Sequence, residues 1–321
     1  MKTKIKIEAI FYLFLTIIFI SFINITSFKF FKSFNLLSNN NIVLITNEGI
    51  IKYEPSSQNQ TLVQPFSENI NNKITTLDDE KLIEFAQIPL DDGGYVFCRL
   101  NNYIFIFDEN LDIYYGNFSI SEIEDYNCIL KPYKNLNGDI TLIISYINGD
   151  NGDEKIKIVK YKINIDQTDN LATYINEIIK GPVTAEGSET STINKVFTCE
   201  FINDSNYPNK LLVYFTVGNS GFLCALKINP ENLSFIEYSQ NLKNIGSNNM
   251  LKSDLSHDKK NIFACFLQSS TSNLNCLLYD VDNNKFNNIS NCISNCYSGY
   301  MDVICINEKQ ECYLFFLIMK M

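Results

Sequence analysis

The amino-acid sequence predicts an all-β chain built from repeated sheets, and two observations predict this fold class. The first is a short apolar segment with the pattern of a β-strand, which recurs six times, mostly at intervals of about 50–60 residues. The second is that turns rich in Asn, Asp and Gly, which reverse the chain readily, stand between the apolar runs. The six copies of the strand lie at 49–53, 103–107, 157–161, 222–226, 276–279 and 312–316.

Four strands can be written for most of the repeats. The middle strands are nearly continuous apolar and β-branched runs, which indicates that both faces of each sheet are packed. We expect strands at 81–88, 95–100, 103–108 and 112–117 in the second repeat, at 126–131, 139–147, 155–163 and 171–177 in the third, at 195–201, 210–217, 222–228 and 233–238 in the fourth, and at 251–255, 261–267, 274–281 and 285–289 in the fifth.

The two ends of the repeated region are incomplete. The first repeat has no clear inner strand, and the sixth ends before an outer strand. Residues 29–37 are therefore predicted to be either a short connector or a closing strand that completes the last repeat and protects its edge. The alternative is that the chain is a fragment.

These repeats resemble the β-propeller superfold over nearly all of residues 38–321, at the level of strand pattern. The resemblance implies a propeller-like ring of about six four-stranded repeats, forming one domain after an N-terminal apolar helix. The sequence contains no WD, kelch, NHL or Asp-box motif, so the resemblance names no family. Fold alone implies no function.

The amino terminus has the pattern of a targeting segment. Three lysines at positions 2, 4 and 6 precede an uncharged apolar run from Ala9 to Phe28, which is long enough to span a bilayer as a helix. We expect residues 1–28 to be a signal-anchor or a cleaved signal peptide. In either case residues 38–321 are exported, so the domain is membrane-anchored with an extracellular or luminal location, or secreted.

Cysteine usage agrees with export, because an even number of cysteines in an exported chain favours disulfides. All ten lie between Cys98 and Cys312. Hairpin register sets Cys265 opposite Cys276 and Cys305 opposite Cys312, so we expect these two pairs to be bridged. The sequence does not show how the other six cysteines pair. The spacing of Cys292 and Cys296 favours a role as disulfide partners over one as zinc ligands.

Sequons for N-glycosylation support the same compartment. Five of them follow the apolar run in expected turns or strand ends, where a glycan could be exposed. They lie at Asn59, Asn117, Asn203, Asn232 and Asn288.

Composition excludes several function classes. The net charge of −10 disfavours nucleic acid as a partner, since both would be polyanions. With His257 as the only histidine and Arg99 as the only arginine, a multi-His metal site and an arginine cluster for phosphate are unavailable. No cofactor-binding motif is present, and we expect none to be required.

Two sets of acidic residues are candidates for chemistry. Carboxylates on expected inner strands could form a glycosidase pair, and these are Glu84, Glu200 and Asp254. Two turns have oxygen-bearing side chains at alternate positions, which is the pattern at the start of a calcium-binding loop. Both turns lack the Gly that follows in such a loop and the distal Glu. These calcium candidates are Asp108, Asn110, Asp112, Asp280, Asp282 and Asn284.

Three functions follow as hypotheses. The first is a non-catalytic recognition domain that binds an unknown protein or glycan through loops. The second is a secreted carboxylate-based hydrolase of glycosidase type, and the third is a structural surface-coat protein. The absence of triad, zinc and arginine-cluster residues favours the first, so we expect that the chain is not an enzyme.

Overall fold

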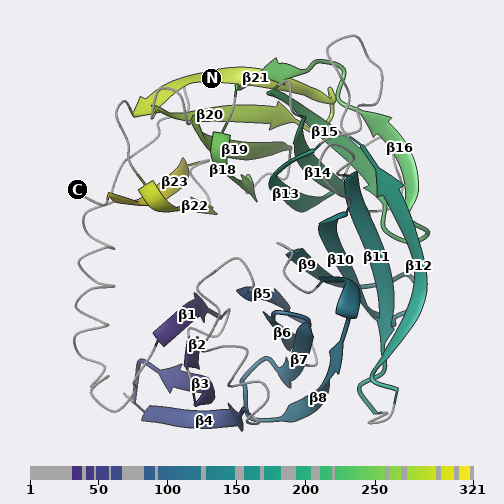
Figure 1. The fold of residues 1–321 in the computed structure, drawn as a ribbon, viewed down its shortest axis with the longest axis vertical. Coiled ribbons are helices and arrows are strands. Elements are labelled where there is room, and N and C mark those ends of the chain that lie inside the picture. Colours follow the sequence, from purple (N-terminus) through teal and green to yellow (C-terminus); the bar gives the residue numbers. More distant parts are fainter. Residues whose placement is uncertain are drawn as a thin grey trace. The chain divides into compact units, whose positions relative to one another are not determined.

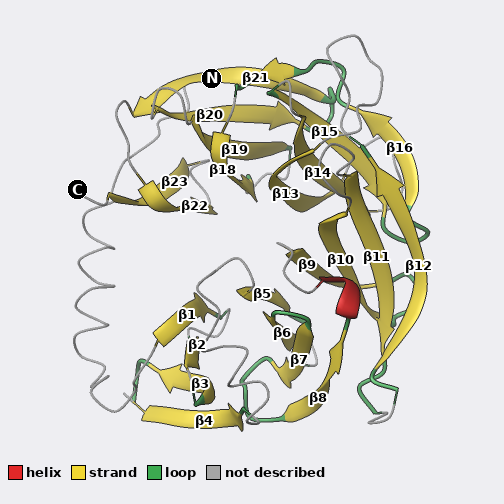
Figure 2. Cartoon of the chain, viewed as in Figure 1, coloured by secondary structure: helices red, strands yellow, loops and turns green. Residues whose placement is uncertain are grey.

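A computed structural model describes residues 31–37, 41–46, 48–57, 59–66, 83–90, 93–123, 128–148, 155–166, 170–181, 193–203, 210–218, 221–246, 248–256, 260–268, 273–293, 298–306 and 311–318. Strands make up most of these residues (Figure 1), and within them the 3₁₀ turn η3 (Ser121–Ile123) is the one helical element (Figure 2). None of the helical structure in these ranges is long and apolar enough to cross a membrane. The run from Ala9 to Phe28, Cys296 and His257 lie outside the described residues.

The described strands form six sheets that follow one another along the chain, and apart from β17 each strand pairs with strands that are consecutive in sequence. The first two sheets contain β1 (Phe31–Leu36), β2 (Ile42–Thr46), β3 (Gly49–Glu54) and β4 (Asn59–Pro65), and then β5 (Ile83–Ile88), β6 (Tyr95–Leu100), β7 (Tyr103–Asp108) and β8 (Tyr114–Ser119). The third contains β9 (Cys128–Lys134), β10 (Ile140–Asn148), β11 (Lys155–Ile163) and β12 (Ala172–Lys180).

The later sheets repeat this arrangement. The fourth contains β13 (Ile193–Asn203), β14 (Lys210–Gly218), β15 (Phe222–Asn229) and β16 (Ser234–Tyr238), with β17 (Lys243–Asn244) added beside β15. The fifth contains β18 (Asn248–Leu255), β19 (Asn261–Gln268), β20 (Asn273–Asp280) and β21 (Lys285–Ile293), and the sixth contains β22 (Ser298–Ile306) and β23 (Glu311–Ile318). The first five sheets each contain a four-stranded meander, and successive meanders of this kind are the blades of a β-propeller, so the all-β propeller fold class is confirmed.

Packing between sheets explains why the middle strands are apolar on both faces. Val96 of β6 lies in one hydrophobic cluster with Val43 of the first sheet. Phe97, the next residue, lies in a second cluster with Leu142 of the third sheet. Because successive side chains of a strand point to opposite faces, the second sheet is packed between its two neighbours.

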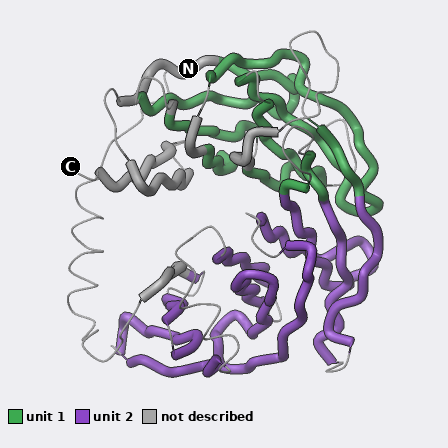
Figure 3. The backbone as a smooth tube through the Cα atoms, in the orientation of Figure 1, with its two compact units in different colours: residues 1–15, 147–157, 178–321 green, residues 16–146, 158–177 purple. Residues whose placement is uncertain are grey.

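The chain divides into two compact units, drawn in different colours in Figure 3. One contains the described residues up to 146 together with 158–177, and thus the first two sheets and most of the third. The other contains 147–157 and the described residues from 178 onward, with the fourth, fifth and sixth sheets. Each unit has its own core, and in the second unit Phe215, Ala264 and Tyr279 belong to the cluster between the fourth and fifth sheets.

The expected strands of repeats two to five agree with the structure to within a few residues at each end. The first repeat differs from expectation. Residues 31–36, which the sequence left as a connector or a closing strand of the last repeat, form β1 and pair antiparallel with β2. This segment supplies the inner strand that the first repeat lacked in the sequence pattern.

The two cysteine hairpins have the expected register. Cys265 of β19 is the partner of Cys276 of β20, and the two are joined in a disulfide with 4.1 Å between their Cα atoms. Cys305 and Cys312 are partners in the pairing of β22 with β23, where the structure describes the backbone only.

Candidate functional site

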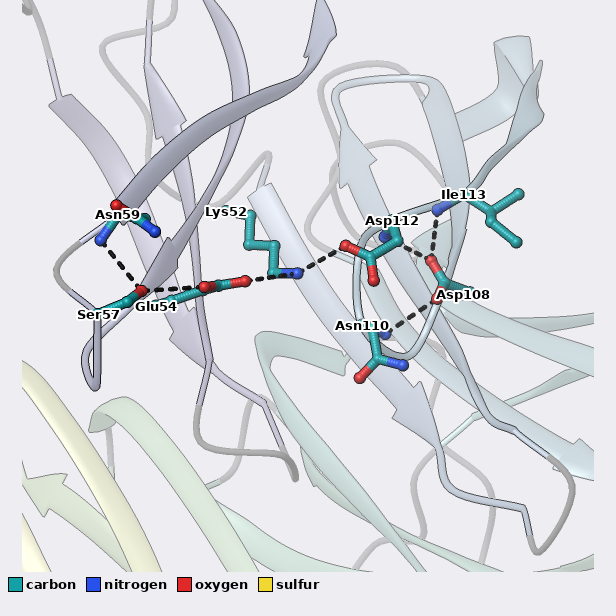
Figure 4. Close-up of polar contacts among 8 residues, drawn as sticks. All are labelled: Lys52, Glu54, Ser57, Asn59, Asp108, Asn110, Asp112 and Ile113. Atoms are coloured by element: carbon teal, nitrogen blue, oxygen red, sulfur yellow. Dashed lines mark hydrogen bonds and ion pairs between the residues drawn. The ribbon is translucent and has the colours of Figure 1, made fainter.

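A cluster of polar side chains joins the first and second sheets (Figure 4). Lys52, at the end of the apolar run of β3, has only 8% of its side chain exposed. Its Nζ lies 2.9 Å from Oε1 of Glu54 on the same strand and 2.7 Å from Oδ1 of Asp112 in the turn between β7 and β8. One ammonium therefore holds a strand of the first sheet to a turn of the second.

Lys52 and Glu54 of this cluster each shift the pKa of the other. Burial by itself lowers the pKa of Lys52, but the hydrogen bonds to Asp112 and Glu54 outweigh burial and raise that pKa above its ordinary 10.5. The hydrogen bond from Lys52 lowers the pKa of Glu54. Glu54 also accepts a hydrogen bond of 3.0 Å from Ser57 Oγ. Lys52 and Glu54 are thus both held in their charged forms at neutral pH.

The turn that receives Lys52 is the first of the two calcium candidates. Oδ1 of Asp108 accepts hydrogen bonds from the backbone N–H of Asp112 and Ile113, at 2.7 and 2.6 Å, and Oδ2 accepts one from that of Asn110 at 3.3 Å. The side chain of Asp108 thus stabilises the backbone of the turn, while the side chain of Asp112 points to Lys52 (Figure 4). The positive charge at this turn is supplied by the chain's own ammonium group.

The second calcium candidate has a similar arrangement. Lys227 of β15, with 1% of its side chain exposed, lies 3.2 Å from Oε1 of Glu237 and donates to the carbonyl oxygen of Val281 at 3.2 Å. Val281 lies in the turn between β20 and β21 of the next sheet. In that turn Asp280 accepts hydrogen bonds from the backbone and side chain of Asn283.

The remaining calcium candidates lie in the same turn. Asp282 is exposed, whereas Asn284 is buried and bonds to Tyr279 Oη and to the carbonyl oxygen of Tyr238. Within the described residues, no three His, Cys, Asp or Glu side chains gather closely enough to hold a metal ion. Sequence could not reveal the lysines as partners, because they lie more than 50 residues from the turns they reach.

The three candidate catalytic carboxylates lie on first strands of different sheets. Glu84 is on β5, opposite Arg99 of β6, and belongs to the first compact unit. Glu200 of β13 and Asp254 of β18 belong to the other unit, where hydrogen bonds at Ser253 link the two strands. Ser253 Oγ donates to Glu200 Oε1 at 2.9 Å and lies 2.9 Å from Thr198 Oγ1.

This contact also shows where Asp254 points. Ser253 and Asp254 are consecutive in β18, so their side chains project from opposite faces of the sheet. The Ser253 side chain reaches Glu200, and Asp254 Oδ1 accepts a hydrogen bond from the N–H of Leu255. Glu200 and Asp254 are thus on neighbouring strands, but the strand geometry directs Asp254 away from the Glu200 side.

Arg99 has a structural position that the sequence did not reveal. Its side chain is fully buried, and it donates to the carbonyl oxygens of Asn101 at 2.6 Å and Ile123 at 2.9 Å. The only arginine of the chain therefore ties the β6–β7 turn to η3. The nearby thiol of Cys128 is buried, which raises its pKa to about 12 although Arg99 acts in the opposite direction.

Exposed apolar side chains gather on one strand. Of the six large apolar side chains that are exposed among the described residues, three lie on β12: Tyr174 at 53%, Ile175 at 44% and Ile179 at 44%. β12 ends the third sheet on one side, next to β11. Exposed apolar residues grouped on one element are typical of interaction surfaces.

The sequons that the structure describes with side chains are accessible. Asn59 begins β4, Asn117 lies in β8 and Asn232 lies in the turn before β16, and all three are exposed. Asn203 ends β13 and Asn288 lies in β21, where only the backbone is described.

The chain matches no protein-family model and no curated protein sequence. Solved structures with a similar fold include the WD40 domain of SCAP from fission yeast, at TM-score 0.49 and 10% identity, with 85% of this chain and 58% of that chain covered. Others are the Nup133 β-propeller domain of Vanderwaltozyma polyspora (0.46, 11%, 74% and 69%) and an endo-arabinase from Bacteroides thetaiotaomicron (0.43, 8%, 80% and 95%). The chain spans less than two thirds of the SCAP chain, and similarities at this level carry no functional inference.

Proposed function

We propose that the chain is a non-catalytic recognition domain that binds a protein partner. The observation that carries this proposal is the group of exposed apolar side chains on β12, which the fold leaves in solvent at the edge of a well-packed sheet. Burial of apolar surface is the main driving force of protein association. A partner surface that covers Tyr174, Ile175 and Ile179 would gain this free energy.

The polar clusters support the same proposal, because their charged groups are engaged in holding sheets together. Lys52 and Lys227 bind turns of the next sheet, and Glu200 accepts a hydrogen bond from Ser253. A glycosidase needs two carboxyl groups about 5–10 Å apart across one substrate. The opposite projection of Ser253 and Asp254 does not favour such a pair on β13 and β18.

We place the domain outside the cytoplasm, anchored by or released from the segment that ends at Phe28. The basic and apolar start of the chain supports export, and so do the exposed sequons at Asn59, Asn117 and Asn232. N-linked glycans need an asparagine that the transferring enzyme can reach. A glycan partner is the alternative ligand class.

Two measurements on the full-length chain, expressed in a secreting eukaryotic cell, test this proposal. In the first, enzymatic deglycosylation should shift the protein on a gel, and Asn59→Gln should remove part of that shift. Protein that stays in the cytosol without glycans would contradict export. In the second, the purified chain should turn over no glycoside, ester or peptide substrate. Turnover that is abolished by Glu84→Gln, Glu200→Gln or Asp254→Asn would show that the chain is a hydrolase and would contradict the proposed non-catalytic function.

A further inference from the structure

The first sheet has two ends, and the chain enters it at one of them. Phe31, the first residue of β1, pairs with Thr46, the last residue of β2, and β3 begins nearby at Gly49. We call this the near end. The other end, which we call the far end, contains the β1–β2 turn and the β3–β4 turn that follows Glu54.

A contact between sheets shows that the second sheet has the same two ends. Lys52, which contacts Glu54 at the end of β3, lies 2.7 Å from Asp112 in the β7–β8 turn (Figure 4). The β7–β8 turn is therefore at the far end. Because neighbouring strands of a meander run in opposite directions, the β6–β7 turn is at the near end.

The beginning of the third sheet follows the same order. The first backbone N–H after β8 donates to the carbonyl oxygen of Asn102 in the β6–β7 turn at 2.9 Å. In η3, which comes next, Glu122 accepts a hydrogen bond of 2.7 Å from Tyr146 Oη, and Tyr146 pairs with Cys128 at the start of β9. The third sheet thus begins at the near end, and Leu136 in its β9–β10 turn is at the far end.

The amino-terminal apolar run is tied closely to the near end. It stops at Phe28, and β1 begins at Phe31. Three residues of fully extended chain cover at most about 11 Å. A run that spans the bilayer therefore holds the start of β1 within that distance of the hydrocarbon. Lys29 follows the run directly, and lysines at such a boundary place their ammonium groups among the lipid headgroups.

We propose that the near end of the first compact unit faces the lipid bilayer and that its far end points away from the membrane. The proposal rests on the anchored form of the proposed exported domain and adds its orientation. The partner of the near end is the headgroup layer of the bilayer, to which the chain itself is tied. A protein that approaches from outside meets the far end first.

Strand length argues against the inverted orientation. β1 has six residues, so its two ends are about 17 Å apart. If the far end faced the lipid, Phe31 would lie at least that far from the membrane, beyond the about 11 Å that the connecting residues cover. Exposed apolar side chains of the far-end turns, Ile113 at 52% and Leu136 at 70%, are therefore held away from the lipid.

One sequon agrees with this orientation. Asn59 pairs with Glu54 at the far end of the first sheet and is exposed. A glycan on this asparagine would extend into solvent, away from the bilayer, where its bulk meets no lipid.

The experiment uses the full-length chain, purified from the membranes of a secreting eukaryotic cell and placed in phosphatidylcholine nanodiscs. The chain contains no tryptophan, so one introduced tryptophan reports from a single position. Lipids with a nitroxide on the headgroup quench tryptophan only at short range. Glu48→Trp and Ser56→Trp are a matched pair, because both residues are exposed and they lie at opposite ends of β3. The nitroxide should remove most of the emission of Glu48→Trp and leave that of Ser56→Trp unchanged.

A second pair keeps the test decisive if one variant does not fold, which circular dichroism melts would show. Ser121→Trp places the probe in η3 at the near end, and Leu136→Trp places it at the far end. The first should be quenched and the second should not. Equal quenching within a pair would show that the sheets lie along the membrane. Stronger quenching at the far end, or none at any position, would also overturn the proposal.

Failure of this orientation is distinguishable from failure of the proposed function. A secreted, glycosylated chain whose intact mass lacks residues 1–28 would remove the anchor and the orientation, and would leave export and recognition in place. A chain that stays in the cytosol without glycans would contradict export itself. Turnover in the hydrolysis screen would contradict recognition, whatever the quenching shows.

Discussion

Replacing Lys52 by methionine tests whether the buried ammonium joins the first two sheets. The substitution keeps most of the apolar stem and removes the charge that lies 2.7 Å from Asp112 and 2.9 Å from Glu54. Hydrogen bonds to charged groups contribute about 1.5–3 kcal/mol each when both partners are shielded from water. Here Asp112 is 63% and Glu54 35% exposed, so water rehydrates both carboxylates and reduces the loss. We expect a loss of about 1–2 kcal/mol in the free energy of unfolding.

The control for this variant is Lys162→Met. Lys162 pairs with Asp139 at the same 2.9 Å separation, but 43% of its side chain is exposed. Exposed ion pairs contribute about 0–1 kcal/mol, so the control should change stability little. For a protein of this size the Lys52→Met loss lowers Tm by about 2–4 °C, measured by calorimetry at pH 7. Equal effects of the two variants would refute the structural role of Lys52.

The pH dependence gives an independent check. The pKa of Glu54 is lowered in the folded chain, so its contribution is present above the pKa of the unfolded chain and is lost as pH falls through the folded value. The pKa of Lys52 is raised, so its contribution is complete below 10.5 and is lost as pH rises through the folded value. The Tm difference between wild type and Lys52→Met should therefore be largest near neutral pH and shrink toward both extremes. A difference that persists unchanged at pH 3 would contradict an electrostatic origin.

Two further predictions concern the second compact unit. Gly221 has φ +76° and an added Cβ would lie 2.8 Å from the backbone of Gly246, so Gly221→Ala should cost about 1–3 kcal/mol in chemical denaturation. The control Gly93→Ala, at φ +107° with open space around the position, should cost less, and an equal cost would exclude the close approach as the cause. Cys265→Ser should lose about 2–3 kcal/mol, as expected for a disulfide that closes an 11-residue loop. A reducing agent should abolish the difference from wild type, and a difference that survives reduction would point to packing instead.

Local pattern was enough to predict the strands and the register of the hairpins. Cys265 and Cys276 lie opposite one another because a short turn and the two-residue period of a strand together fix which residues meet. The same reasoning placed Cys305 opposite Cys312. Residues 31–36 were assigned less well, since a short polar and aromatic segment does not show which sheet it joins.

The candidate site depended on contacts that sequence does not contain. The expected calcium turns had the right oxygen spacing, yet the partner of Asp112 is Lys52, 60 residues earlier in the chain. Glu84, Glu200 and Asp254 shared an inner-strand pattern, but their side chains take their directions from strand pairing and sheet packing. The spacing of residues along the chain shows which ligand atoms a turn could offer. The neighbouring sheet decides which group binds to them.

The amino-acid sequence by itself determined the strand repeats, the all-β class and the acidic balance of the chain, because each depends on local periodicity or composition. Tertiary structure alone decided which apolar residues are core and which are surface. Ile175 and Ile179 have the same residue type as buried Ile156 and Ile158 of the adjacent strand. They are exposed because β12 ends its sheet, and the end of a sheet is a property of strand order in space.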